Sequence, residues 1–123
     1  MSNFEGHLDL RRLGPRRYRL LAPFTYYLGR AAGGWRLTVP IGAETDFESI
    51  PAPFAWLFRR DGPAGRAAVI HDWLYRNPVV SRAVADAIFL DAMATDKVPR
   101  WQRWPLYFGV RLGGWASYQG GEP

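Results

Sequence analysis

The sequence predicts an α+β protein with a small antiparallel sheet in its N-terminal half, packed on three to four helices in its C-terminal half. Two observations predict this division. The earlier half contains short runs of β-branched and aromatic residues bounded by Gly and Pro. In the later half, apolar residues recur at three- and four-residue spacing, the period of an amphipathic helix. We therefore expect a single domain over residues 1–123, β-rich over 7–42, with a motif loop at 43–52 and helices over 53–118.

Three strands are predicted directly and a fourth more weakly. They are Tyr18–Leu21, Phe24–Leu28 and Trp35–Val39, with the weaker strand at His7–Leu10. In the third strand, Trp35, Leu37 and Val39 alternate with polar residues, as in a strand that is buried on one face. Residues 29–34 are expected to form a hairpin loop. One face of this sheet would be exposed to solvent.

The helical half is divided by prolines and by one capping residue. The predicted segments are a short helix at 53–59, a strong helix at 63–76, a second strong helix from Ser81 to about Thr95, and a last segment from Pro99 to about Tyr118. Asn77-Pro78 ends the first strong helix, because the residue before a proline disfavours helical backbone. Ser81 is a suitable N-cap for the second. The last segment is expected to be interrupted at Pro105 and at Gly113-Gly114.

The composition indicates a folded chain and excludes several kinds of chemistry. Hydrophobic residues make up 48% of the chain and charged residues 22%, which is enough apolar content for a core. There is no cysteine, so disulfides and thiolate metal sites are impossible, and a metal ion would need oxygen or imidazole ligands. We find neither a secretory signal nor a long apolar run, and we expect no membrane span and synthesis in a cytoplasm.

The net charge is +5, and Lys97 is the only basic residue that is not Arg. The arginines occur in small groups, such as Arg11-Arg12 and Arg59-Arg60, and never in a long basic tract. Phosphate neutralisation needs cationic side chains. However, this dispersed pattern favours solvated arginines or a protein interface, so we do not expect nucleic acid to be the partner.

His71, Asp72 and Asp86 form a candidate site, because a hairpin of the two strong helices would bring them to the same level. Residues equally far from the turn between these helices face each other. Successive helical residues point about 100° apart. One of His71 and Asp72 is therefore expected to face the second helix, and the other the sheet or the preceding loop. Tyr75 lies one turn beyond His71 on the same face, where its hydroxyl is expected within reach of a carboxylate.

Three roles are open for this cluster. In the first, His71 is a general base, with Asp72 and Asp86 completing a catalytic site. In the second, a divalent metal ion is held by these residues, with Asp72 and Asp46 as ligands. In the third, the groups only satisfy one another's hydrogen bonds. Asp46 lies in the motif loop, where such residues also bond their own backbone.

Three motifs of the chain resemble those of a family found in tailed bacteriophages and prophages, the domain of unknown function 1353. They are Thr45–Pro51 (TDFESIP), Ala68–Tyr75 (AVIHDWLY) and Ala85-Asp86 followed by Phe89. The resemblance extends over residues 15 to 115. It implies a phage-encoded protein from neighbourhoods of virion morphogenesis and tail genes, and it implies no settled activity.

The segment His71-Asp72-Trp73-Leu74-Tyr75 is also similar to the His-Asp-x-x-Tyr core of secreted phospholipases A2. In that family the His activates water, the Asp binds calcium, and an Asp of the facing helix orients the His. The similarity implies these roles for His71, Asp72 and Asp86. The chain has neither the glycine-rich calcium loop nor the disulfides of that family.

Aromatic residues are interleaved with arginine near the C-terminus. They are Trp101, Trp104, Tyr107, Phe108 and Trp115, with Arg100, Arg103 and Arg111. Such a mixture is typical of a protein contact surface and would also suit stacking on sugars or bases. We select Trp101, Trp104 and Arg103 as binding candidates, together with Asp46 and Tyr75 of the earlier motifs. The alternative is that the last helix turns four large apolar side chains towards the core, namely Trp104, Tyr107, Phe108 and Leu112.

From these features we expect a bacteriophage protein of the virion, in the tail or tail tip, that acts in assembly or in contact with the host envelope. Its partners would be other virion proteins, chiefly of the tail, and the host cell envelope. The alternative is a phage-encoded hydrolase of the host envelope, acting on peptidoglycan or lipid. In that case His71 is the base, Asp86 its orienter, and Asp72 or Asp46 a ligand of a divalent metal ion. No other cofactor is indicated.

Overall fold

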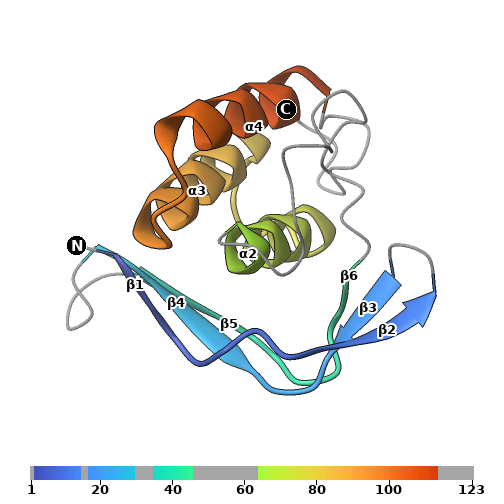
Figure 1. Cartoon of the computed structure of the whole chain (residues 1–123). Helices are drawn as coiled ribbons and strands as arrows, with labels where there is room; N and C mark the ends of the chain where they lie inside the picture. Colours follow the sequence, from blue (N-terminus) through green and yellow to red (C-terminus); the bar gives the residue numbers. More distant parts are fainter. Residues whose placement is uncertain (1, 15–16, 30–34, 46–63, 114–123) are drawn as a thin grey trace.

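The computed structural model describes residues 2–14, 17–29, 35–45 and 64–113. In this part of the chain, strands occupy the N-terminal half and helices the C-terminal half, which confirms the predicted α+β class. The strands are β1 (Asn3–Glu5), β2 (Leu10–Gly14), β3 (Arg17–Leu20), β4 (Phe24–Leu28), β5 (Trp35–Val39) and β6 (Glu44–Thr45). The helices are α2 (Gly65–Arg76), α3 (Arg82–Thr95) and α4 (Arg100–Gly113). They lie on one side of the strands, with α4 on the outside (Figure 1).

The strands form two small antiparallel sheets in place of one. The strand order is β1-β4-β5 in the first sheet and β2-β3-β6 in the second. Because β1 leads into β2, β3 into β4 and β5 into β6, the same three chain segments contribute one strand to each sheet. The arrangement is a three-stranded meander that is bent across its middle, and the helices occupy the inside of the bend (Figure 1).

The bend lies where the strands cannot continue their ladder of hydrogen bonds. Pro23 and Pro40 have no backbone N–H to donate. Gly42 has a φ of 87°, in the left-handed region that favours glycine. Leu20 closes the bend from the middle segment, because its N–H donates to the Ala43 carbonyl at 2.8 Å and its carbonyl accepts from the Gly42 N–H at 2.9 Å.

The structure corrects one of the four predicted strands. Phe24–Leu28 and Trp35–Val39 are confirmed to the residue, and β3 begins and ends one residue earlier than predicted. The strand predicted at His7–Leu10 is wrong, since only its last residue belongs to a strand. The N-terminal segment pairs with β4 as β1 instead, and then leaves the ladder at Gly6, whose φ is 98°. Residues 7–9 therefore fall in the bend.

The core lies between the bent strands and the helices. Its members are buried apolar side chains from both halves, including Leu20, Phe24, Tyr26, Val39, Ile70, Leu74, Phe89, Met93 and Leu106. Two polar contacts add to this packing. The Tyr26 hydroxyl of β4 donates to the Asp91 carboxylate of α3. The Arg66 guanidinium of α2 pairs with Asp96 and donates to the Gly6 carbonyl at 2.9 Å. Both helices that carry the candidate site are thus held against the sheet.

The ends of α2 and α3 agree closely with the prediction. Ser81 is the N-cap of α3, since its Oγ accepts from the Val84 N–H at 3.3 Å, and the helix ends at Thr95. α2 begins at Gly65, two residues later than predicted, and ends at Arg76. The predicted helix at 53–59 and most of the motif loop lie outside the described residues, but two residues of that loop form β6.

None of the helices between residues 64 and 113 has the length and hydropathy needed to cross a membrane.

α4 continues through Pro105, so the interruption predicted there is wrong. Pro105 has no N–H to donate to the carbonyl of Trp101, four residues earlier. The helix persists because Leu106, Gly109 and Val110 are buried on its inner side, where α4 packs against α3. Burial of these residues outweighs the loss of one helical hydrogen bond. The break predicted at Gly113-Gly114 coincides with the last described residue of the helix.

Candidate functional site

Asp86 is the centre of the candidate site and is fully buried on α3. Its Oδ1 contacts His71 Nε2 and accepts from the Tyr75 hydroxyl, and both distances are 2.6 Å. Its Oδ2 accepts from Arg111 Nη1 at 2.9 Å. His71 and Tyr75 belong to α2 and Arg111 belongs to α4. One carboxylate therefore joins all three described helices.

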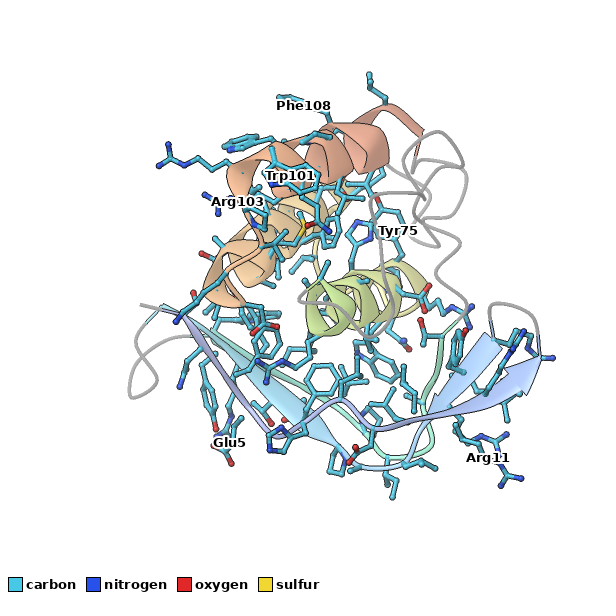
Figure 2. All side chains as sticks on the ribbon, in the orientation of Figure 1. Glu5, Arg11, Tyr75, Trp101, Arg103 and Phe108 are labelled. Carbon is cyan, nitrogen blue, oxygen red and sulfur yellow. The ribbon has the colours of Figure 1, made fainter. Side chains whose placement is uncertain are left out.

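α2 places His71 and Tyr75 on the same face because they are four residues, about one turn, apart. Their ring centroids are 4.1 Å apart, and the His71 ring also packs on Phe89 of α3 at 4.7 Å. Figure 2 shows Tyr75 pointing from α2 towards the other two helices. The exposed fraction is 0% for His71 and 1% for Tyr75, so both rings are part of the core.

Arg82 is a second buried charge beside Asp86. Its Nη1 lies 3.6 Å from Asp86 Oδ2, one helical turn away on α3. The same nitrogen donates to the carbonyls of Val110 at 3.1 Å and Arg111 at 3.3 Å. These carbonyls lie in the last turn of α4, where the helix dipole is negative and backbone acceptors need partners. Arg82 thus pairs with Asp86 and caps the end of α4.

The cluster keeps Asp86 charged and His71 neutral. Burial alone raises the pKa of Asp86, but hydrogen bonds from His71, Tyr75 and Arg111 together hold that pKa below its usual 3.8. Burial lowers the pKa of His71 below its usual 6.5, against the opposing effect of Asp86, and Arg82 adds to the lowering. A neutral imidazole that donates to a carboxylate carries its proton on the contacting nitrogen, here Nε2. Burial, and then Asp86, raise the pKa of Tyr75.

Asp72 does not join this cluster. It is buried on the sheet side of α2, close to Thr45 of β6 and to Trp73. Its Oδ2 lies 3.3 Å from Arg76 Nε, one turn further along the helix. The divergence of neighbouring helical positions explains the separation, because His71 faces α3 while Asp72 faces the strands. The structure therefore brings together His71 and Asp86 and sets the third predicted catalytic residue apart.

A metal centre has no visible ligand set in the part of the chain that the structure describes. Among residues 2–14, 17–29, 35–45 and 64–113, no three His, Asp or Glu side chains converge as a metal site requires. Asp46, the other predicted ligand, lies outside these ranges. A metal-binding role for Asp72 and Asp46 stays a prediction.

A family model described as "Protein of unknown function (DUF1353)" matches residues 18–110, about three quarters of the chain. The chain belongs to this family. No curated protein and no solved structure shows significant similarity to this chain. In this DUF1353 protein the match includes His71, Tyr75, Arg82 and Asp86, and it ends one residue before Arg111.

The predicted contact residues of α4 differ in their surroundings. Trp101 is 67% exposed and Trp104 is 41% exposed, so both are open to a partner. Arg103 is partly buried, and its Nη1 donates to the Val98 carbonyl at 3.0 Å, just before its own helix. Arg103 therefore supports the start of α4, and its role as a contact residue stays a prediction.

The alternative that placed four apolar side chains of α4 towards the core is wrong for three of them. The exposed large apolar residues of this helix include three of that group, Trp104, Phe108 and Leu112. Only Tyr107 packs against the core. The inner side of α4 is instead formed by Leu106, Gly109 and Val110.

Arg82 and Arg111 were not among the residues that the sequence predicted for the site. Arg82 precedes Asp86 by four residues on α3, a spacing at which opposite charges meet, so a local signal was present. Arg111 is 25 residues from Asp86 and reaches it only because α4 packs on α3. No pattern in the sequence marks that contact.

The neutral state of His71 makes stability depend on pH. In the unfolded chain His71 takes up a proton below about 6.5, whereas in the folded protein its pKa is lowered, so acid favours unfolding. We expect the free energy of unfolding to fall as the pH drops below that value, by at most about 1.4 kcal/mol per pH unit. His71→Gln, which keeps a donor towards Asp86 but does not titrate, should lose this dependence. Urea titrations at several pH values test this. The same acid sensitivity in His71→Gln would contradict it.

Proposed function

We propose that this chain is a bacteriophage protein, a virion component of the tail or tail tip that acts through contacts in assembly or with the host envelope. It would be made in the host cytoplasm and reside in the virion. Its partners would be other virion proteins, chiefly of the tail, and the host cell envelope. The motifs that resemble a family of tailed bacteriophages and prophages support this context.

The observation that carries a contact role is the outer face of α4, which consists of Trp101, Trp104, Phe108 and Leu112. Their exposed fractions are 67%, 41%, 52% and 76%. Monomeric soluble proteins rarely expose a large contiguous apolar patch without a binding role. Aromatic residues are also enriched where proteins meet partners. The outer face of α4 therefore supports a protein that works by surface contact.

The burial of the polar cluster supports the same choice. A general base must come within hydrogen-bond distance of the proton that it removes from a substrate or a water molecule. His71 and Asp86 have an exposed fraction of 0%, and Asp86 is further engaged by two arginines. This arrangement fits a cluster that joins helices better than one that processes a substrate.

Particle composition tests the proposal. We expect mass spectrometry of purified phage particles to detect the chain, and Trp101→Ser with Phe108→Ser to reduce its incorporation. The matched control is Ile41→Ser with Val79→Ser, which removes side chains that are 65% and 69% exposed but lie off α4. Absence of the wild-type chain from the particles would overturn the proposal.

The second candidate is a phage-encoded hydrolase of the host envelope, acting on peptidoglycan or lipid. It is favoured by the 2.6 Å contact between His71 Nε2 and Asp86. A carboxylate that holds one ring nitrogen orients the imidazole, so that the other nitrogen, Nδ1, would act as the base. The partner Asp comes from the facing helix, as it does in the phospholipases A2. Asp46 stays a candidate ligand for a divalent ion, whereas an ion held by Asp72 would lie apart from His71, because Asp72 faces the strands.

Two substitutions of His71 separate the candidates. Gln preserves a donor towards Asp86 and should preserve the fold, whereas Ala leaves the carboxylate without that donor and should lower the free energy of unfolding by about 1–3 kcal/mol. Stability is measured by urea unfolding, and activity by the release of muropeptides or fatty acids from host envelopes. A folded His71→Gln protein that has lost the wild-type activity would establish the hydrolase. A wild-type protein without activity would exclude it.

A further inference from the structure

We propose that the outer face of α4 binds the surface of an anionic lipid bilayer. The inference rests on the proposed function, because it names envelope lipid as one partner of a protein that works by contact. It is carried by the geometry of the outer face, by the charges beside it and by the position of α4 in the fold.

The outer face is a continuous stripe. At about 100° per residue, its four side chains fall within an arc of about 80° that runs along the helix. Leu106, Gly109 and Val110, which pack the helix against α3, lie on the other side. α4 is therefore apolar on two sides, and only one of them is covered by the rest of the described structure.

The charged residues along α4 have one sign. Every charged residue from 97 to 113 is basic. Lys97 and Arg100 are exposed beside the first turn of the helix, and Arg100 falls about 40° from Trp104 around the helix axis. An amphipathic helix with aromatic side chains on one face and cations beside them lies in the headgroup region of anionic membranes, where apolar burial and charge attraction add.

The form of this surface favours a bilayer over the other occupants. α4 is the outermost helix, and Phe108 points away from the rest of the molecule (Figures 1 and 2). A convex ridge needs a groove in a partner protein, whereas a lipid surface deforms around it. A second copy of the chain would bring basic residues against basic residues. Exposed Trp is also suited to the membrane interface, because its ring is apolar and its N–H is polar.

Vesicle sedimentation tests the inference with the full chain. We expect binding to vesicles of phosphatidylcholine mixed with phosphatidylglycerol, weak binding to phosphatidylcholine alone, and weaker binding at high salt. Trp101→Ser with Phe108→Ser should reduce partitioning about tenfold or more, because two large apolar side chains no longer enter the bilayer. The control pair Ile41→Ser with Val79→Ser should bind as the wild type does. Urea unfolding of each variant verifies that the fold is intact.

The outcomes separate this inference from the proposed function. No binding to anionic vesicles, or equal binding by the α4 variant, would overturn the lipid inference. If particles still lose the α4 variant, the virion proposal stands and the face takes a protein partner. If the wild-type chain dimerises through this face, the occupant is a second copy and the inference falls. Vesicle binding by a chain that is absent from particles would support lipid binding and overturn the virion proposal.

Discussion

Asp86 is the constraint on which the helical half depends. A buried carboxylate is costly unless hydrogen bonds and opposite charges surround it. Here α2 supplies His71 and Tyr75, α4 supplies Arg111, and Arg82 of α3 lies beside them. A different packing of any one helix would leave a buried charge or donor without its partner. The cluster therefore selects one arrangement of three helices, whose apolar surfaces alone permit several.

The same cluster holds the end of α4 against α3. Arg111 reaches inward to Asp86, while Arg82 binds the carbonyls of Val110 and Arg111 in the last turn. These contacts hold the last turn of α4 against α3, while the stripe that begins at Trp101 is exposed. The buried polar site and the exposed apolar surface thus meet on one helix. The proposed contact role does not require chemistry at His71.

The sequence predicted the parts of the fold that depend on local pattern. The contact of His71 with Asp86 follows from two helices of clear period joined by a short turn. The sequence did not predict the division of the sheet, because the bend depends on pairing between segments far apart in the chain. Nor did it predict which side of α4 is buried. Trp101, Trp104 and Phe108 recur at helical spacing, and so do Leu106 and Val110, so the sequence pattern alone does not choose between the two sides of the helix.

Asp86 and Arg111 together hold α4 against α3. A double-mutant cycle of Asp86→Asn, Arg111→Gln and the double variant, followed by urea unfolding, measures that coupling directly. We expect a coupling free energy of about 0.5–3 kcal/mol, with the double variant more stable than the sum of the single losses would give. Losses that add within about 0.5 kcal/mol would show that the two residues do not act on each other and that this ion pair does not hold α4 in place.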